Sequence, residues 1–258
     1  MRNSRLLLTV IGITIVVMWN AKPGQATAWP GPDAFGYHGV SIGNNLRHIS
    51  ATGTQTGGDD ISYPVPLGFN FNFYGNNFTQ AFISTNGFLS FTNPSHGCCN
   101  GQAVPGASIE NLVAGSWFDL ISSTNPYYQT LGAPGSREFV AGYYNDQEFC
   151  CTGDFNFEII LHEGTNDIEL QYGHMEAIRH TASVGIQDGT RTVGLQLLYG
   201  QNLDSLSNQG FCIGTEGSPC ATTGVPEPAT ATLVGIGLAA AGVLRCRYMS
   251  HVRRQRWL

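Results

Sequence analysis

Six of the seven cysteines lie in the central part of the chain, where they could form disulfides or bind a metal ion. They comprise two adjacent pairs and two single residues: Cys98, Cys99, Cys150, Cys151, Cys212 and Cys220. Zinc is disfavoured because adjacent cysteines lack the spacing with which two thiolates surround a tetrahedral ion. A bond between neighbouring cysteines is disfavoured because it is strained. We therefore expect two bridges between Cys98-Cys99 and Cys150-Cys151 and one between Cys212 and Cys220, although spacing alone leaves other pairings open.

Acidic side chains cluster at two places and suggest calcium binding. The clusters are Asp59 with Asp60, and Asp146 with Glu148 and Asp154. Neither cluster matches the spacing of a helix-flanked calcium loop. We therefore interpret both as solvated turns and predict no metal ion and no cofactor.

Histidines and tyrosines offer two further chemistries. His174 and His180 could lie near Asp119 or Asp188, but no serine-hydrolase, zinc-protease or Cys/His motif accompanies them. We predict surface histidines and no catalytic residue, and a hydrolase with an unrecognised site is the weakest alternative. Paired tyrosines could stack on sugars, although alternation along a strand usually buries one ring of each pair. These are Tyr127, Tyr128, Tyr143 and Tyr144.

The elements that must position these residues are β-strands. Apolar and polar residues alternate over residues 69–73, 155–162 and 168–172, and the last two runs flank a Gly-containing turn that predicts a hairpin. Further strands are expected at residues 78–84, 87–91, 112–118, 137–144, 182–187 and 193–199. No segment between Trp29 and Gly224 shows a sustained helical period. The fold class predicted is therefore all-β, an antiparallel β-sandwich ectodomain.

The order of motifs in this region resembles the nidogen-type extracellular (NIDO) domain. The Phe-alternating strand ends in Tyr74-Gly75, and Ser84-Thr85-Asn86-Gly87-Phe88 follows. Later segments at residues 112–119, 139–172 and 183–189 continue the family's order, so the resemblance covers about residues 66–188. Gly115 and Ser116 replace the family's usual Pro-Phe. The resemblance implies an adhesive or scaffolding extracellular domain without shared catalytic residues.

The first 28 residues read as a secretory signal peptide. Arg2 and Arg5 precede an apolar run at residues 6–19, and an A-x-A site precedes Trp29. The apolar run is short for a membrane span, and an uncleaved anchor is the alternative. We expect a signal helix at residues 1–28 and an ectodomain at residues 29–222.

Residues 223–258 read as a membrane-targeting tail. Val225, Pro226, Glu227 and Pro228 precede an uncharged run at residues 229–244. As a helix this run spans about 24 Å, slightly less than the ~30 Å of a hydrocarbon core. The basic tail at residues 245–258 contains five stop-transfer arginines and is predicted to be cytoplasmic. They are Arg245, Arg247, Arg253, Arg254 and Arg256.

This three-part order resembles the PEP-CTERM sorting signal of exported Gram-negative bacterial proteins. The resemblance implies an exosortase, a membrane-embedded cysteine protease, as a partner that cuts near Pro-Glu-Pro. The sandwich is thus expected to be flanked by a signal helix and a transmembrane helix in the precursor, and the mature form to reach the cell envelope or the medium. A plain C-terminal membrane anchor is the alternative.

Charge restricts the partners of the ectodomain. Between Trp29 and Gly224, four arginines and no lysine stand against seventeen acidic residues, a net charge of −13. A nucleic-acid partner is excluded because phosphate binding needs clustered basic residues, and anionic lipid is disfavoured for the same reason. We expect an exported, non-enzymatic adhesive or structural protein that contacts extracellular polysaccharide or surface proteins. A carbohydrate-binding module is the alternative.

Overall fold

A computed structural model of the chain describes residues 31–122, 125–149, 151 and 153–222. The predicted signal helix at residues 1–28, the Pro-Glu-Pro motif, the transmembrane helix and the basic tail lie outside the described residues. Within the described ranges, no helix is long and apolar enough to cross a membrane.

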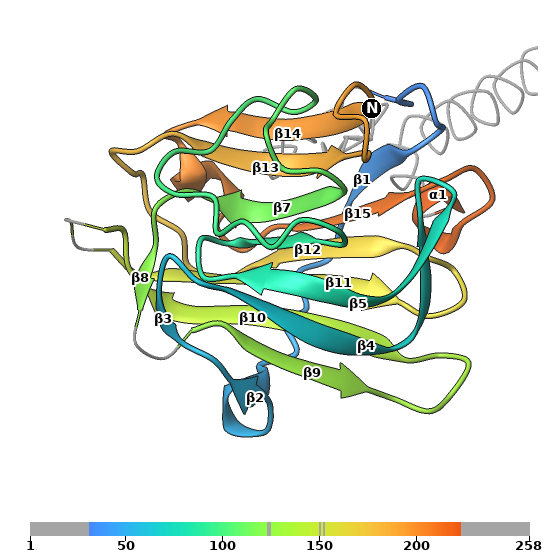
Figure 1. The fold of residues 1–258 in the computed structure, drawn as a ribbon, viewed down its shortest axis with the longest axis horizontal. Coiled ribbons are helices and arrows are strands. Elements are labelled where there is room, and N and C mark those ends of the chain that lie inside the picture. The colour runs from blue at the N-terminus through green and yellow to red at the C-terminus, as the bar shows by residue number, and fades with distance from the viewer. Residues whose placement is uncertain (1–30, 123–124, 150, 152, 223–258) are drawn as a thin grey trace, which may run out of the picture.

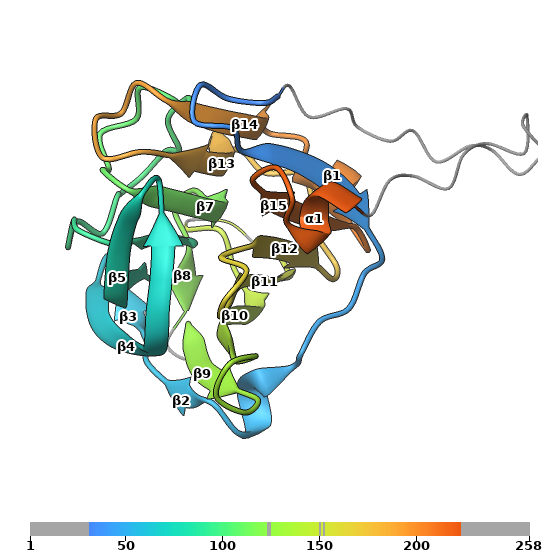
Figure 2. The same ribbon diagram turned by 90° about the vertical axis from the view of Figure 1, so that its right-hand side faces the viewer.

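Two antiparallel sheets pack face to face (Figures 1 and 2). The first sheet has the order β1-β15-β12-β11-β10-β9-β2. Its strands are β1 (His38–Ile42), β15 (Gly210–Gly214), β12 (Ile168–Tyr172), β11 (Phe155–His162), β10 (Glu138–Asp146), β9 (Tyr127–Leu131) and β2 (Thr54–Gln55). The sandwich predicted from alternation is therefore confirmed.

The second sheet has the order β14-β13-β7-β6-β5-β4. Its strands are β14 (Gly194–Gly200), β13 (Ala182–Gln187), β7 (Leu112–Trp117), β6 (Phe88–Ser90), β5 (Asn76–Ser84) and β4 (Ser62–Phe73). A two-stranded sheet pairs β3 (Gly58–Asp59) with β8 (Ile121–Ser122). The remaining elements are the 3₁₀ turns η1 (Ile49–Ala51) and η2 (Leu203–Leu206) and the single-turn α1 (Pro219–Thr222).

The strand expected at residues 69–73 is longer and begins at Ser62, whereas the other expected strands form within two residues of their predicted bounds. The strands β11 and β12 make the predicted hairpin, with Phe157 opposite Tyr172. Sequence reasoning missed β1 and β15, which pair with each other. Both are five-residue strands that contain glycine, so neither carries enough alternation to stand out. The edge strand β1 therefore forms because it pairs with β15, a segment distant in the sequence, and not because of a local sequence pattern.

The main core lies between the sheets and is rich in aromatic rings. Phe71, Phe73 and Phe91 are at most 4% exposed, and the ring centroids of Phe73 and Phe91 lie 4.9 Å apart. A second small cluster lies on the outer face of the first sheet, where Ile160 and Val140 pack beneath Ile49 of η1. Because η1 covers the outer face of the first sheet, apolar side chains are buried on both faces of β11 at this point. This explains why Ile160 interrupts the alternation of apolar and polar residues in β11.

The long loop at residues 92–111 folds back over the second sheet. Val104, Ala107 and Ile109 are buried against Phe88 and Trp117. The amide of Gln187 donates to the carbonyls of Ala107 and Ile109, at 2.9 and 2.6 Å. Apolar burial and hydrogen bonds from the Gln187 side chain to the backbone therefore hold this loop.

Candidate functional site

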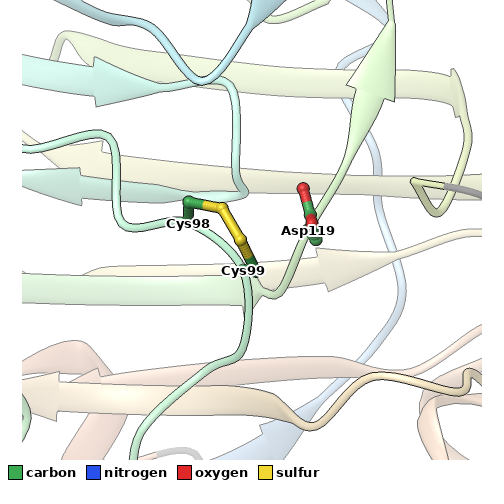
Figure 3. Close-up of side chains that lie close together, drawn as sticks. All are labelled: Cys98, Cys99 and Asp119. Atoms are coloured by element: carbon green, nitrogen blue, oxygen red, sulfur yellow. A yellow bond between two sulfur atoms is a disulfide. The ribbon is translucent and has the colours of Figure 1, made fainter.

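The cysteines pair differently from the prediction. Cys98 is bonded to Cys99, and Cys212 is bonded to Cys220 (Figure 3 shows the first pair). The Cys212–Cys220 bridge is confirmed. The double bridge between Cys98-Cys99 and the Cys150-Cys151 segment is wrong, because both sulfurs of the first pair are used within the pair. Cys150 lies outside the described residues, and Cys151 is half-buried.

Asp119 lies beside the Cys98–Cys99 disulfide at one end of the sandwich, and Figure 3 shows its side chain alongside the two sulfurs. It follows β7 and precedes β8, so it stands where the chain leaves the second sheet. Asp59 and Asp60 reach the same place from β3 and the bend after it, and their carboxylate oxygens lie within 4.8 Å of those of Asp119. Three carboxylates from distant positions in the sequence thus converge.

His180 borders this group and is oriented by a second carboxylate. Its Nδ1 lies 2.7 Å from Oε1 of Glu148, and the same oxygen accepts the backbone N–H groups of Arg179 and His180. Its Nε2 faces Oδ2 of Asp119 at 4.0 Å. His180 was predicted to be a surface histidine; its side chain is only 20% exposed, and it lies near Asp119, as the sequence had allowed. A carboxylate-oriented imidazole is a geometry suited to proton transfer, but no described residue donates a hydroxyl or thiol to its Nε2.

Burial controls the ionisation of these acids. The pKa of Asp119 is raised above its usual value, first because the side chain is buried and next because Asp60 is close. Asp146 is 1% exposed, and burial raises its pKa to about 7. The prediction that Asp146 and Glu148 are solvated turn residues is wrong, since both side chains are buried.

Two other sites that the sequence raised only as possibilities do not form. His174 is exposed, as predicted, and its Nε2 lies 3.2 Å from Oε1 of Glu176; it belongs to none of the ligand clusters among the described residues. Tyr143 is fully buried and Tyr144 is 8% exposed, so neither can stack on a sugar. Tyr127 and Tyr128 are half-buried: Tyr127 packs against the outer cluster around Ile49, and Tyr128 packs against the main core.

A polar cavity that sequence reasoning missed opens at the turn between β4 and β5. Its volume is about 490 Å³. The lining residues are Tyr74, Asn76, Asn77, Phe78, Thr92, Asn111, Asp188, Gly189 and Thr190. The amide of Asn111 donates to the Thr92 hydroxyl at 3.0 Å, whereas its carbonyl oxygen is buried without a partner. Aromatic rings beside amides and hydroxyls are the side chains that recognise sugars. The abundance of asparagine in residues 70–77 is the only sequence signal for it.

Comparison of the sequence with protein families gives one match. The model of the family described as NIDO related matches residues 40–219. Comparison with curated proteins and with solved structures finds no match. The matched region extends the resemblance seen at residues 66–188 to β2, β14, β15 and most of β1. Because the match covers more than half of the chain, the protein belongs to the NIDO-related family.

Proposed function

We propose that this chain is an exported, non-enzymatic surface or matrix protein whose NIDO-related sandwich has an adhesive or structural role. The family and the two disulfides indicate an extracellular or secreted domain. The single observation that carries the proposal is the NIDO-related sandwich stapled by the Cys212–Cys220 disulfide, since such bonds persist in oxidising compartments. The acidic composition between Trp29 and Gly224 keeps such a domain soluble and away from nucleic acid.

The proposal assigns the ends of the chain to export. Residues 1–28 direct secretion, and residues 229–244 hold the precursor in the membrane until an exosortase-type protease cuts near Val225, Pro226, Glu227 and Pro228. The five arginines of residues 245–258 act as the stop-transfer signal. Support for these roles comes from the order of the three parts in the sequence.

Replacing Glu227 by glutamine is expected to block processing, because the acidic residue between the two prolines is part of the proposed recognition motif. The measurement is the intact mass of the protein recovered from a host with and without its exosortase. The wild-type protein should lack residues 229–258 only when the protease is present, and the Glu227→Gln variant should retain them in both hosts. Glu216→Gln is the matched control, because Glu216 is an exposed glutamate that lies before the motif. A wild-type protein that keeps residues 229–258 in the native host would contradict the processing role.

A second candidate function is carbohydrate binding, and the cavity beside β4 and β5 favours it. Asn76 and Asn77 are exposed at its rim, and Asp188 and Thr190 face them. The walls combine hydrogen-bonding groups with the rings of Tyr74 and Phe78. Such a site could take one or two sugar units of an extracellular polysaccharide.

The carbohydrate hypothesis predicts that Asn76→Ala weakens binding of host polysaccharide fragments about tenfold, the effect of one hydrogen bond worth ~1.4 kcal/mol. Calorimetric titration of the full chain measures this loss. Asn202→Ala is the control, because Asn202 is an exposed asparagine away from the cavity. Equal affinity of the two variants, or a glycan array without any binding to the folded protein, would exclude this cavity as a sugar site.

A further inference from the structure

We propose that the polar cavity at the β4–β5 turn binds a sugar that carries a primary ammonium group. This inference rests on the carbohydrate-binding function proposed for the cavity and names the class of sugar. The cavity holds about 490 Å³, a size typical of small-molecule sites. Its walls combine amides, hydroxyls, two aromatic rings and one carboxylate. The amides and hydroxyls suit sugar hydroxyls, whereas the carboxylate and the rings favour a positive charge.

Asp188 is the only charged residue among the described residues that line the cavity. Its Oδ1 accepts the N–H groups of Thr192 and Val193, at 3.1 and 3.2 Å, and its Oδ2 accepts the Thr190 hydroxyl at 2.5 Å. Burial by itself would raise the pKa of Asp188, but these hydrogen bonds hold the pKa below its ordinary value. The carboxylate is therefore a fixed negative charge in the cavity wall at neutral pH.

No basic side chain neutralises this charge within the described part of the chain. The neighbouring Arg191 pairs with another acid, since its Nε lies 3.9 Å from Oε1 of Glu110. The region between Trp29 and Gly224 carries a net charge of −13, so the surrounding field also repels anions. A sugar with a positive group is thus favoured over an acidic one.

A buried acceptor on the same wall lacks a donor. Asn111 is 7% exposed, its amide donates to the Thr92 hydroxyl at 3.0 Å, and its Oδ1 has no partner among the described residues. The backbone N–H of Asn111 donates to the carbonyl of Asp188 at 3.2 Å, so the two side chains come from adjoining segments. Buried polar groups nearly always have a partner. An ammonium has three N–H donors, enough to pair with Asp188 and to satisfy Asn111.

Gly189 leaves space in front of the Asn111 amide. An added Cβ at position 189 would lie 2.9 Å from Nδ2 and 3.2 Å from Oδ1 of Asn111, closer than ordinary van der Waals contact. Gly189 is not among the glycines with a positive φ, so its backbone conformation does not require glycine. The missing side chain therefore matters for the cavity and not for the turn.

Two aromatic rings complete the walls. The hydroxyl of Tyr74 donates to Oδ2 of Asp33 at 2.7 Å, which fixes this ring and places a second carboxylate behind it. The ring of Phe78 stacks on Phe91 with centroids 4.9 Å apart. Aromatic faces attract an ammonium group and also cover the apolar face of a sugar ring. Both contacts suit an amino sugar.

Calorimetric titration of the full chain in detergent with the disaccharides of chitosan, chitin and cellulose tests the class of sugar. The three differ only in the amine, acetamide or hydroxyl group on each ring. We expect the chitosan disaccharide to bind about tenfold more tightly than the other two, because only its ammonium groups pair with the carboxylate. Equal or tighter binding of the chitin or cellulose disaccharide would overturn this inference and leave the carbohydrate function in place. Absence of binding by all three would overturn both.

Replacing Asp188 by asparagine separates a specific contact from general attraction to an acidic surface. The variant keeps an Oδ1 acceptor for the two backbone N–H groups of its loop and loses only the charge. It should lose the preference and bind the chitosan and cellulose disaccharides with similar affinity. Asp204→Asn, which removes an exposed acid outside the cavity, should keep the wild-type preference. An unchanged preference in Asp188→Asn, or an equal loss in both variants, would reject the assignment.

Replacing Gly189 by alanine tests the wall formed by Asn111. The added Cβ should weaken binding of the chitosan disaccharide about tenfold, the effect expected when one hydrogen bond to a charged group is lost. Gly43→Ala is the control, because Gly43 is exposed and a Cβ there meets nothing within 4 Å. A cooperative melting transition shows that each variant is folded. Wild-type affinity in folded Gly189→Ala would show that the ligand does not reach this wall and would contradict the proposal.

Discussion

Replacing Gly87 by alanine is expected to lower the free energy of unfolding by about 3 kcal/mol or more, the sum of a left-handed backbone and a steric overlap. Gly87 has a φ of 83°, and an added Cβ would overlap the carbonyl oxygen of Ser116 on β7. Its own carbonyl accepts the N–H groups of Gly115 and Ser116, at 3.1 and 3.0 Å. A shift that relieved the overlap would break these bonds.

Urea unfolding of the full chain measures this change, and Gly135→Ala is the matched control. Gly135 also has a positive φ, 94°, but a Cβ there meets nothing within 4 Å. The control should lose only the backbone term, about 1–2 kcal/mol. Equal losses in the two variants would mean that the contact with Ser116 has no role.

Replacing Asp146 by asparagine is expected to stabilise the protein at pH 8 and to have little effect at pH 4. The folded pKa of Asp146 is about 7, above the ordinary value of 3.8, because burial disfavours the charged form. Its Oδ2 has no hydrogen-bond partner among the described residues, whereas Oδ1 accepts the N–H of Gln147 at 3.0 Å. The folded state therefore binds a proton more tightly than the unfolded state does.

The sign of the pH effect follows from this difference. The stabilisation by the protonated carboxyl is fully present below the unfolded pKa and is lost as pH rises through the folded pKa. Across pH 4–7 the wild type should lose about 4 kcal/mol from this group, at ~1.4 kcal/mol per unit of pKa difference. The asparagine amide, which stays neutral, should lose none of it.

Urea unfolding at pH 4, 6 and 8 measures the difference between variant and wild type at each pH, so that other titrating groups cancel. Asp204→Asn, in an exposed position, serves as the control and should show a small difference that does not change with pH. A constant difference for Asp146→Asn across this range would show that Asp146 is ionised in the folded protein throughout.

Several parts of the fold could be predicted because they depend on local pattern. Alternating side chains define β11 and β12 and the hairpin between them, since one face of each strand must be buried. The motif at residues 84–88 indicated the family, and the structure gives its physical basis. Ser84 and Asn86 tie the turn to neighbouring loops, and only glycine at position 87 allows β7 to approach.

The candidate site was only partly predictable. Each acid was visible in the sequence, but Asp59-Asp60 and Asp119 are separated by about sixty residues and no motif links them. The spacing of the cysteines likewise favoured bridges between the two adjacent pairs, whereas Cys98 pairs with Cys99. Contacts of this kind depend on the distances between loops, which no local pattern encodes.

The sequence by itself determined the strand pattern, the all-β class and the acidic character of the central domain. It also determined the expectation of export, which rests on the order of charged, apolar and proline residues at the two ends. The tertiary structure alone decided which acids are buried, which cysteines bond and where the polar cavity opens. The physical reason is that alternation and composition are properties of neighbours in the chain. Burial, pKa and ligand geometry, in contrast, arise where segments distant in sequence pack against one another.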